Sequence, residues 1–132
     1  MPLIRSSQEV FPIECVGPAA QYLFSATDLG PAVGPVPAGG NVVSPVLICP
    51  GMKNIAVGVK STQAGAINVQ RFLDEAGTIP QGAVVTAALV ANTQATLNVN
   101  DGVAFASFTV QITNTGGSPA TLSNFGVLAQ AT

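Results

Sequence analysis

The feature that most limits the fold of this chain is a two-residue alternation of apolar and polar side chains. It is clearest over residues 105–113, where Phe108, Val110 and Ile112 are separated by threonine and glutamine. Successive side chains of a strand point to opposite faces of a sheet, so the pattern predicts a strand with one buried face. Further strand-like segments occupy residues 21–25, 42–49, 54–60, 66–72, 84–90, 93–99 and 121–130.

The links between these segments are short and rich in turn residues. Asn100-Asp101-Gly102 and residues 114–117 supply the positive φ values that tight reversals need, and no link is long enough for a crossover helix. We therefore expect an all-β fold, an antiparallel β-sandwich of about eight strands, jelly-roll-like or immunoglobulin-like, over residues 41–132. Residues 84–90 are mostly β-branched or apolar, which predicts a strand buried on both faces.

The first forty residues differ in composition from the rest. More than half of residues 28–40 are proline or glycine. A loop of this length without structure of its own is uncommon unless it is functional or disordered. We expect residues 1–40 to form an extended N-terminal arm and loop, held on a neighbouring subunit or on the chain's own sandwich. Its apolar candidates for partner contact, with the same two alternatives, are Ile4, Val10, Phe11 and Ile13.

Charge is scarce along the chain. It has four basic and six acidic residues, so 8% of the residues are charged, where about 25% is usual. A surface with few charges favours close contact with other subunits, because little charge is desolvated on association. The four basic residues are scattered, so we expect no nucleic-acid partner. The long uncharged stretches are interrupted by Pro, Asn, Gln and Gly, so we expect no membrane partner either.

The groups that most enzymes use are scarce as well. The chain has no histidine, which removes the serine and cysteine triads and imidazole metal ligands. Asp74 and Glu75 are adjacent, which suits a solvated turn better than a carboxylate pair, and no other acidic residue clusters with Asp28 or Asp101. We therefore expect no enzyme activity, no cofactor and no metal. With no Trp and one Tyr, a sugar-stacking platform would depend on phenylalanines, of which we expect Phe108 and Phe125 to lie in the core.

The two cysteines, Cys15 and Cys49, are distant in sequence and do not by themselves demand a disulfide. The first nine residues lack the apolar stretch of a secretion signal. A reducing compartment is then expected, in which both cysteines are small buried or half-buried thiols.

Three segments of the C-terminal third share a recurring layout. Residues 95–102 read ATLNVNDG, residues 108–116 read FTVQITNTG, and residues 120–126 read ATLSNFG. This layout consists of a strand, a polar turn, a second strand that ends in T-N-x-G, and a last strand that contains F-G. It resembles small β-sandwich accessory virion proteins of tailed phages, of the head decoration or cement type.

The resemblance implies a structural virion protein rather than an enzyme. It implies a homotrimer that binds the major capsid protein or another virion protein and stabilises the assembled shell, with the N-terminal arm as a clamp. It also implies a place in the virion, after assembly in the host cytoplasm. Two other functions remain open: an adhesion, receptor-binding or carbohydrate-binding module of a fibre or tail, and a small shell protein that assembles by itself.

Overall fold

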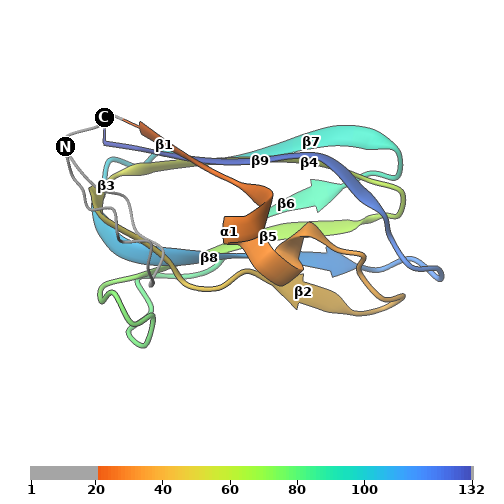
Figure 1. Ribbon diagram of the computed structural model, residues 1–132, viewed down its shortest axis with the longest axis horizontal. Coiled ribbons are helices and arrows are strands. Elements are labelled where there is room, and N and C mark those ends of the chain that lie inside the picture. Colours follow the sequence, from red (N-terminus) through yellow and green to blue (C-terminus); the bar gives the residue numbers. More distant parts are fainter. Residues whose placement is uncertain (1–20, 132) are drawn as a thin grey trace.

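The computed structural model describes residues 21–131, which form two antiparallel sheets packed face to face (Figure 1). The first sheet has four strands in the order β1-β9-β4-β7. They are β1 (Gln21–Phe24), β9 (Leu122–Gln130), β4 (Asn54–Ser61) and β7 (Thr93–Val99). The predicted antiparallel β-sandwich is confirmed.

The second sheet is built around β8 (Phe105–Asn114), in the order β2-β8-β5-β6. Its other strands are β2 (Asn41–Val43), β5 (Gly65–Phe72), β6 (Val85–Leu89) and β3 (Leu47–Met52), which also pairs with β8. The single strand expected over residues 42–49 is therefore two strands. Both lie on one edge of β8, with β2 opposite residues 111–113 and β3 opposite residues 105–108.

The strand order distinguishes between the two expected sandwich types. If β2 and β3 count as one interrupted strand, the sheets are 1-9-4-7 and 2-8-5-6, so the first strand pairs with the last. In an immunoglobulin sandwich the first strand pairs with the second. The interleaved order found here, with eight strand positions in two sheets, is that of a jelly roll.

The core lies between the two sheets and follows the alternation seen in the sequence. Every second side chain of β4 and of β5 from Ile67 on is buried, and β8 shows the same alternation from Phe108 to Asn114. Phe108 is fully buried at the centre and contacts Phe24 and Phe105 edge to face, each with ring centroids 5.6 Å apart. The contact with Phe24 joins β1 of one sheet to β8 of the other.

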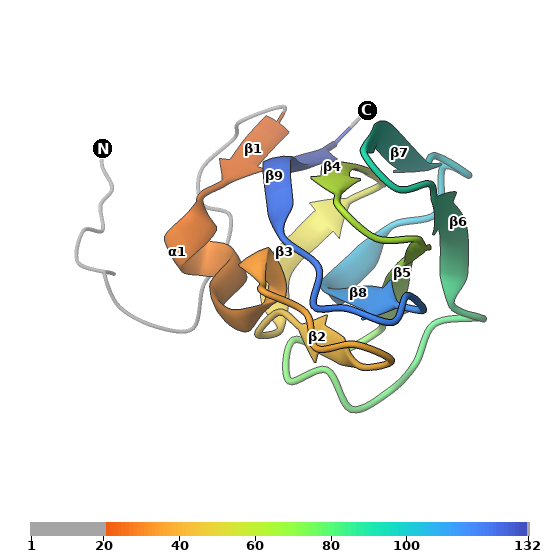
Figure 2. The same cartoon turned by 90° about the vertical axis from the view of Figure 1, so that its right-hand side faces the viewer.

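A short helical segment closes the side of the sandwich between β1 and β2 (Figure 2). It comprises α1 (Ala26–Leu29) and the 3-10 helix η2 (Gly30–Val33). Ser25 begins α1 with a capping box, in which its hydroxyl accepts from the Asp28 backbone and the Asp28 carboxylate accepts from the Ser25 backbone. Leu29 and Ala32 are buried, and η2 contacts strands of both sheets.

Residues 21–40 were expected in the extended arm, but the structure places them in the sandwich. Val36 is fully buried and forms a β-bridge with Ala120. The buried side chain of Asn114 donates to the carbonyls of Val36, Pro37 and Ser118, at 3.2, 3.2 and 2.8 Å. The Pro/Gly-rich loop is therefore held by its own domain, which was one of the two alternatives left open.

The expectation that residues 84–90 form a strand buried on both faces is wrong. β6 pairs only with β5 among the described strands, so it lies at a sheet edge, and Thr86 and Ala88 are exposed on its outer face. The β-branched and small residues that suggested full burial are also common in edge strands that bury one face and expose the other.

Cys49 lies on β3 and is fully buried and disulfide-bonded, so the expectation of a free thiol is wrong for this residue. The only other cysteine of the sequence, Cys15, lies outside the described residues.

Replacing Asn114 with alanine should lower the free energy of unfolding by about 1–3 kcal/mol, because buried carbonyls around residues 36–37 would lose their donor. Urea denaturation followed by circular dichroism measures the change. Asn98→Ala, at an exposed position of β7, is the control and should stay within about 0.5 kcal/mol. Equal losses in the two variants would contradict the role given to Asn114.

Candidate interaction surface

The residues predicted to contact a partner, Ile4, Val10, Phe11 and Ile13, all lie outside the described residues. Their contact role stays a prediction. The chain nevertheless enters the described structure at a definite place, because Gln21 begins β1 opposite Gln130, the last residue of β9. The same end of the sandwich holds the start of β4 and of β8, and the end of β5.

Two loops at this end expose aliphatic side chains. The loop between β5 and β6 projects from the sandwich (green at the lower left of Figure 1), and the loop between β7 and β8 lies beside it. Together they carry four exposed aliphatic residues: Leu73, Ile79, Val84 and Val103, which are 60%, 51%, 50% and 48% exposed. We call these four residues the loop surface.

The β5–β6 loop is held in one shape by Asp74. Its carboxylate accepts from the backbone of Thr78 and Ile79, each at 2.9 Å, and from the Thr78 hydroxyl. These hydrogen bonds lower the pKa of Asp74, with the Thr78 side chain as the largest cause. The Ser107 hydroxyl donates to the Asp74 carbonyl at 2.6 Å. Asp74 therefore lies in a turn, as expected from the sequence, and its carboxylate and carbonyl accept hydrogen bonds that hold this turn together.

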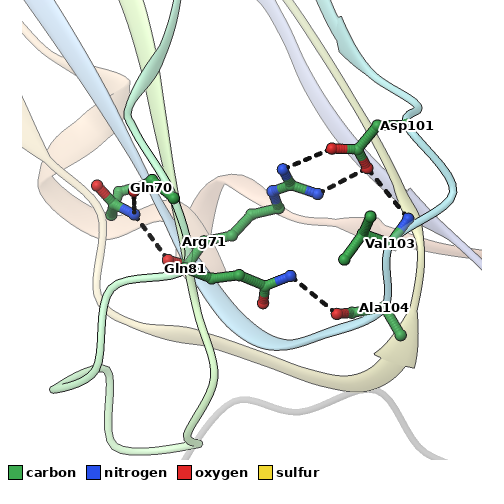
Figure 3. Close-up of polar contacts among 7 residues, drawn as sticks. Gln70, Arg71, Gln81, Asp101, Val103 and Ala104 are labelled. Carbon is green, nitrogen blue, oxygen red and sulfur yellow. Dashed lines mark hydrogen bonds and ion pairs between the residues drawn. The ribbon is translucent and has the colours of Figure 1, made fainter.

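An ion pair ties the two loops to the sheet (Figure 3). The Arg71 guanidinium donates two hydrogen bonds to the Asp101 carboxylate, at 2.9 and 2.8 Å. Only 10% of the Arg71 side chain is exposed, against 49% for Asp101. The Val103 backbone also donates to Asp101, at 3.1 Å. Hydrogen bonding from Arg71, followed by that from Val103, lowers the pKa of Asp101 to about 2.

Two glutamines complete this support, as Figure 3 also shows. Gln81 donates from its side chain to the Ala104 carbonyl at 3.0 Å, which joins the two loops. Gln70 donates to the Gly82 carbonyl at 3.2 Å. The loop surface is therefore presented by a hydrogen-bonded framework rather than by unsupported chain.

The ion pair was not expected from the sequence, in which the four basic residues are scattered. A signal was present, because Arg71 follows Ile67 and Val69 at two-residue spacing and therefore lies on the inward face of β5. A charge in phase with core residues predicts a buried partner. The partner itself, on a turn 30 residues away, carries no such signal.

An apolar groove lies at the same end of the molecule, on the edge of the second sheet. Its volume is about 310 Å³, it is open to solvent, and it is lined by Val46, Ile48, Glu75 and Ala76. Gly77 has a φ of 73°, and a Cβ there would lie 2.8 Å from Cγ2 of Val46, the residue before β3, so both the backbone and the packing favour glycine at this position.

A second, smaller cavity of about 130 Å³ lies on the outer face of the second sheet. It is lined by Val43, Asn68, Gln70, Val84, Thr109 and Gln111. Asn68 donates to Gln111 and Thr113, at 3.3 and 3.1 Å, and accepts from Thr86 at 2.9 Å. The lining is uncharged and offers amide and hydroxyl groups.

Of the aromatic residues that the structure describes, Phe24, Phe105 and Phe108 are buried in the core, whereas Phe72 is partly exposed on the outer face of β5. Phe108 is fully buried, which confirms its predicted place, and Phe125 packs against the core while partly exposed. Within residues 21–131 the exposed large apolar side chains are all aliphatic. Burial, and then the charge of Asp28, raise the pKa of Tyr22, whose ring lies edge to face against Phe24.

No three His, Cys, Asp or Glu residues among residues 21–131 gather where they could hold a metal ion. Within the same range, no helix is both long and apolar enough to span a membrane. Comparison with known proteins adds no family, since no family model and no curated protein matches the sequence.

Asp101→Asn should destabilise the protein at neutral pH and cost nothing near pH 2. The folded-state pKa of Asp101 lies below its ordinary value of 3.8, so its ion pair stabilises the fold above about pH 4 and is lost as the pH falls through about 2. Urea midpoints measured between pH 2 and pH 7 should therefore converge for the two proteins at the acid end. Glu75→Gln, in the neighbouring loop, is the control. A constant difference between Asp101→Asn and the parent protein at every pH would contradict this assignment.

Proposed function

We propose that this protein is a structural virion protein of the decoration or cement type. It forms a homotrimer, binds the assembled shell of a major capsid protein and stabilises that shell. Because it binds the assembled state and not the loose subunits, it shifts the equilibrium towards assembly by mass action. Its place is the virion, and it needs no cofactor.

The observation that carries the proposal is the loop surface. Four exposed aliphatic side chains lie on loops that Arg71, Asp74, Gln81 and Asp101 hold in place. Exposed apolar groups on a rigid framework are typical of protein interaction sites, because little conformational entropy is lost on binding.

The point where residues 1–20 join the described chain supports this end of the sandwich as the one that faces the shell. Residues 1–20 join the structure at Gln21, at the end of the sandwich that carries the loop surface. A clamp formed by residues 1–20 and a patch formed by the loop surface would then engage one partner together. Several moderate contacts on one trimer add through effective concentration.

The jelly-roll order and the low charge also support a role in assembly. Jelly rolls occur in viral capsid proteins and in lectin domains. The fold is therefore compatible with a structural virion protein and with a glycan-binding module, and does not distinguish between them. With 8% charged residues, this chain has few charges to desolvate when subunits pack together.

A second candidate, a glycan-binding module of a fibre or tail, is favoured by the amide-lined cavity. Asn68, Gln70 and Gln111 offer the neutral hydrogen-bonding groups that sugar hydroxyls require. The aliphatic character of the exposed apolar residues among 21–131 weighs against it, since sugar rings usually stack on exposed aromatic rings. A glycan array with the purified protein, and with Gln111→Ala as control, tests this candidate.

The native molar mass, measured by size-exclusion chromatography with light scattering, tests the oligomer. A trimer is expected. A stable monomer would contradict the homotrimer, and a megadalton species would indicate a shell that assembles by itself.

Changing Leu73 and Ile79 together to serine should weaken binding to preassembled capsids of the major capsid protein from the same viral genome by about 10–100-fold. Full burial of a large aliphatic side chain contributes about 1.5–3 kcal/mol. Leu73 and Ile79 are only 60% and 51% exposed, so burying the exposed parts of both contributes about the same total, and 1.4 kcal/mol corresponds to a factor of ten. Cosedimentation with the capsids measures the affinity.

The matched control is Val90→Ser. Val90 is 62% exposed, close to the 60% of Leu73, but follows β6 at the opposite end of the sandwich. It should bind like the parent protein. Equal weakening by both variants, or by neither, would argue against the loop surface as the shell-facing site.

A further inference from the structure

We propose that β6 is a contact site for a second copy of this chain, in which two β6 strands pair antiparallel about a twofold axis at Ala87. The second sheets of the two copies then continue into each other across the contact. This inference goes beyond the proposed function and does not rest on it, because neither the shell nor the trimer enters the argument. The contact joins two single copies or two trimers in the same way.

One edge of β6 is open to solvent, at the side of the sandwich away from α1 (Figure 2). Among the described strands, β6 pairs with β5 alone. Val85 and Ala87 face the core opposite Val69 and Ile67 of β5, which are fully buried, yet both are themselves partly exposed. Side chains that face the core reach solvent past the open edge of their sheet. The strand therefore offers backbone N–H and carbonyl groups to another strand.

The other strands at sheet edges carry features that oppose such pairing. β1 and β2 have only four and three residues. β3 contains Pro50, and its pairing with β8 shifts register between Ile48 and Met52. β7 lies beside Lys60 of β4, which is paired with Gln94. Short length, proline, irregular pairing and lysine are means by which natural edge strands avoid pairing with each other.

β6 has none of these features. Residues 83–91 read AVVTAALVA, without charge, proline or glycine. Like charges directly opposite each other oppose strand pairing, and a twofold contact brings the same surface of both copies together. An uncharged strand of β-branched and small residues meets its own copy without repulsion, whereas it offers no charge to a partner recognised by charge. The partner that this edge fits best is therefore a second copy.

The spacing of the exposed side chains fits a twofold axis at Ala87, the middle residue of β6. Val84 then lies opposite Val90 of the second copy, and Thr86 lies opposite Ala88. Val84 and Val90 are 50% and 62% exposed, and Thr86 and Ala88 are exposed between them. Directly opposite side chains have Cβ atoms about 4.5–5.5 Å apart, close enough to pack together. This register covers the exposed valines at both ends of the strand and pairs every residue of β6.

The contact is small. Residues 84–90 are far fewer than the roughly 20–30 residues that each side of a stable interface contains. We therefore expect the contact to be weak in dilute solution, where it does not set the molar mass, and to form where copies are concentrated.

Engineered cysteines test the register. Thr86→Cys and Ala88→Cys are prepared as separate full-length proteins, mixed at high concentration and oxidised with copper phenanthroline. The two cysteines are directly opposite in the mixture, whereas two copies of one variant place them diagonally, about 7–8 Å apart, which is too far for a disulfide without backbone movement. On a non-reducing gel we expect several-fold more disulfide-linked dimer from the mixture than from either variant alone.

The matched control is a mixture of Thr96→Cys and Asn98→Cys. Both positions are exposed on β7, another edge strand, and have the same two-residue spacing. This mixture should give no more dimer than its single variants. The parent protein, in which Cys49 is disulfide-bonded, gives the background from disulfide exchange.

A charge placed on the edge strand gives a second measurement. Ala88→Lys should weaken self-association at high protein concentration several-fold, because two lysines meet across the contact. Sedimentation equilibrium measures the association constant, and circular dichroism checks that the variant is folded. Asn98→Lys, at an exposed position of β7, is the control and should associate like the parent protein.

The outcomes that would overturn the inference are distinct. Equal dimer from the Thr86/Ala88 mixture and from its single variants, or from the β6 and β7 mixtures, would contradict the pairing. More dimer from Thr86→Cys alone than from the mixture would contradict the axis at Ala87. Self-association unchanged by Ala88→Lys would show that copies meet at another surface. Because the assay contains no capsid and reports which residues are opposite, failure of shell binding or of the trimer leaves its result standing.

Discussion

The structure depends on the burial of one face of β8. This strand pairs with β2 and β3 on one edge and with β5 on the other, so it holds the second sheet together. Its inward side chains, with Phe108 at the centre, meet β1 across the core. Its last residue, Asn114, holds the proline-rich loop that closes one side of the sandwich. A single strand therefore fixes the sheet, the core and the closure of the domain.

The rarity of charge gives the few ionic groups a large structural part. Burying Arg71 without a partner would be costly in free energy. Asp101, in the loop that connects β7 of the first sheet to β8 of the second, accepts two hydrogen bonds from its guanidinium. Asp74 organises the neighbouring loop in a similar way, through backbone and hydroxyl donors. Two of the six acidic residues thus shape the end of the sandwich that exposes Leu73, Ile79 and Val103. Residues 1–20 join the described structure at the same end, through Gln21, and the proposed shell contact falls there.

The candidate surfaces differ in what they are suited to bind. The loop surface is aliphatic and rigid, which favours another protein, whereas the cavity around Asn68 is small, uncharged and rich in amides, which suits a neutral polar ligand. The groove beside β3 is mainly apolar, with Glu75 as the charged residue of its described lining. The loop surface and the cavity share Val84, so Leu73 and Ile79 test the first and Gln111 tests the second.

The sequence by itself determined the sandwich and most strand positions, because the alternation in segments such as residues 54–60 and 105–113 is local and states which side chains face the core. It also located turns such as that at Gly102, which has a φ of 79°. The tertiary structure alone decided the jelly-roll order, the split of residues 42–49 into β2 and β3, and the exposed edge at β6. It alone paired Arg71 with Asp101 and packed Val36 against the sandwich. The reason is physical: periodicity reports which face of a strand is buried, but pairing partners, loop contacts and grooves arise between segments far apart in the chain, and no local pattern encodes them.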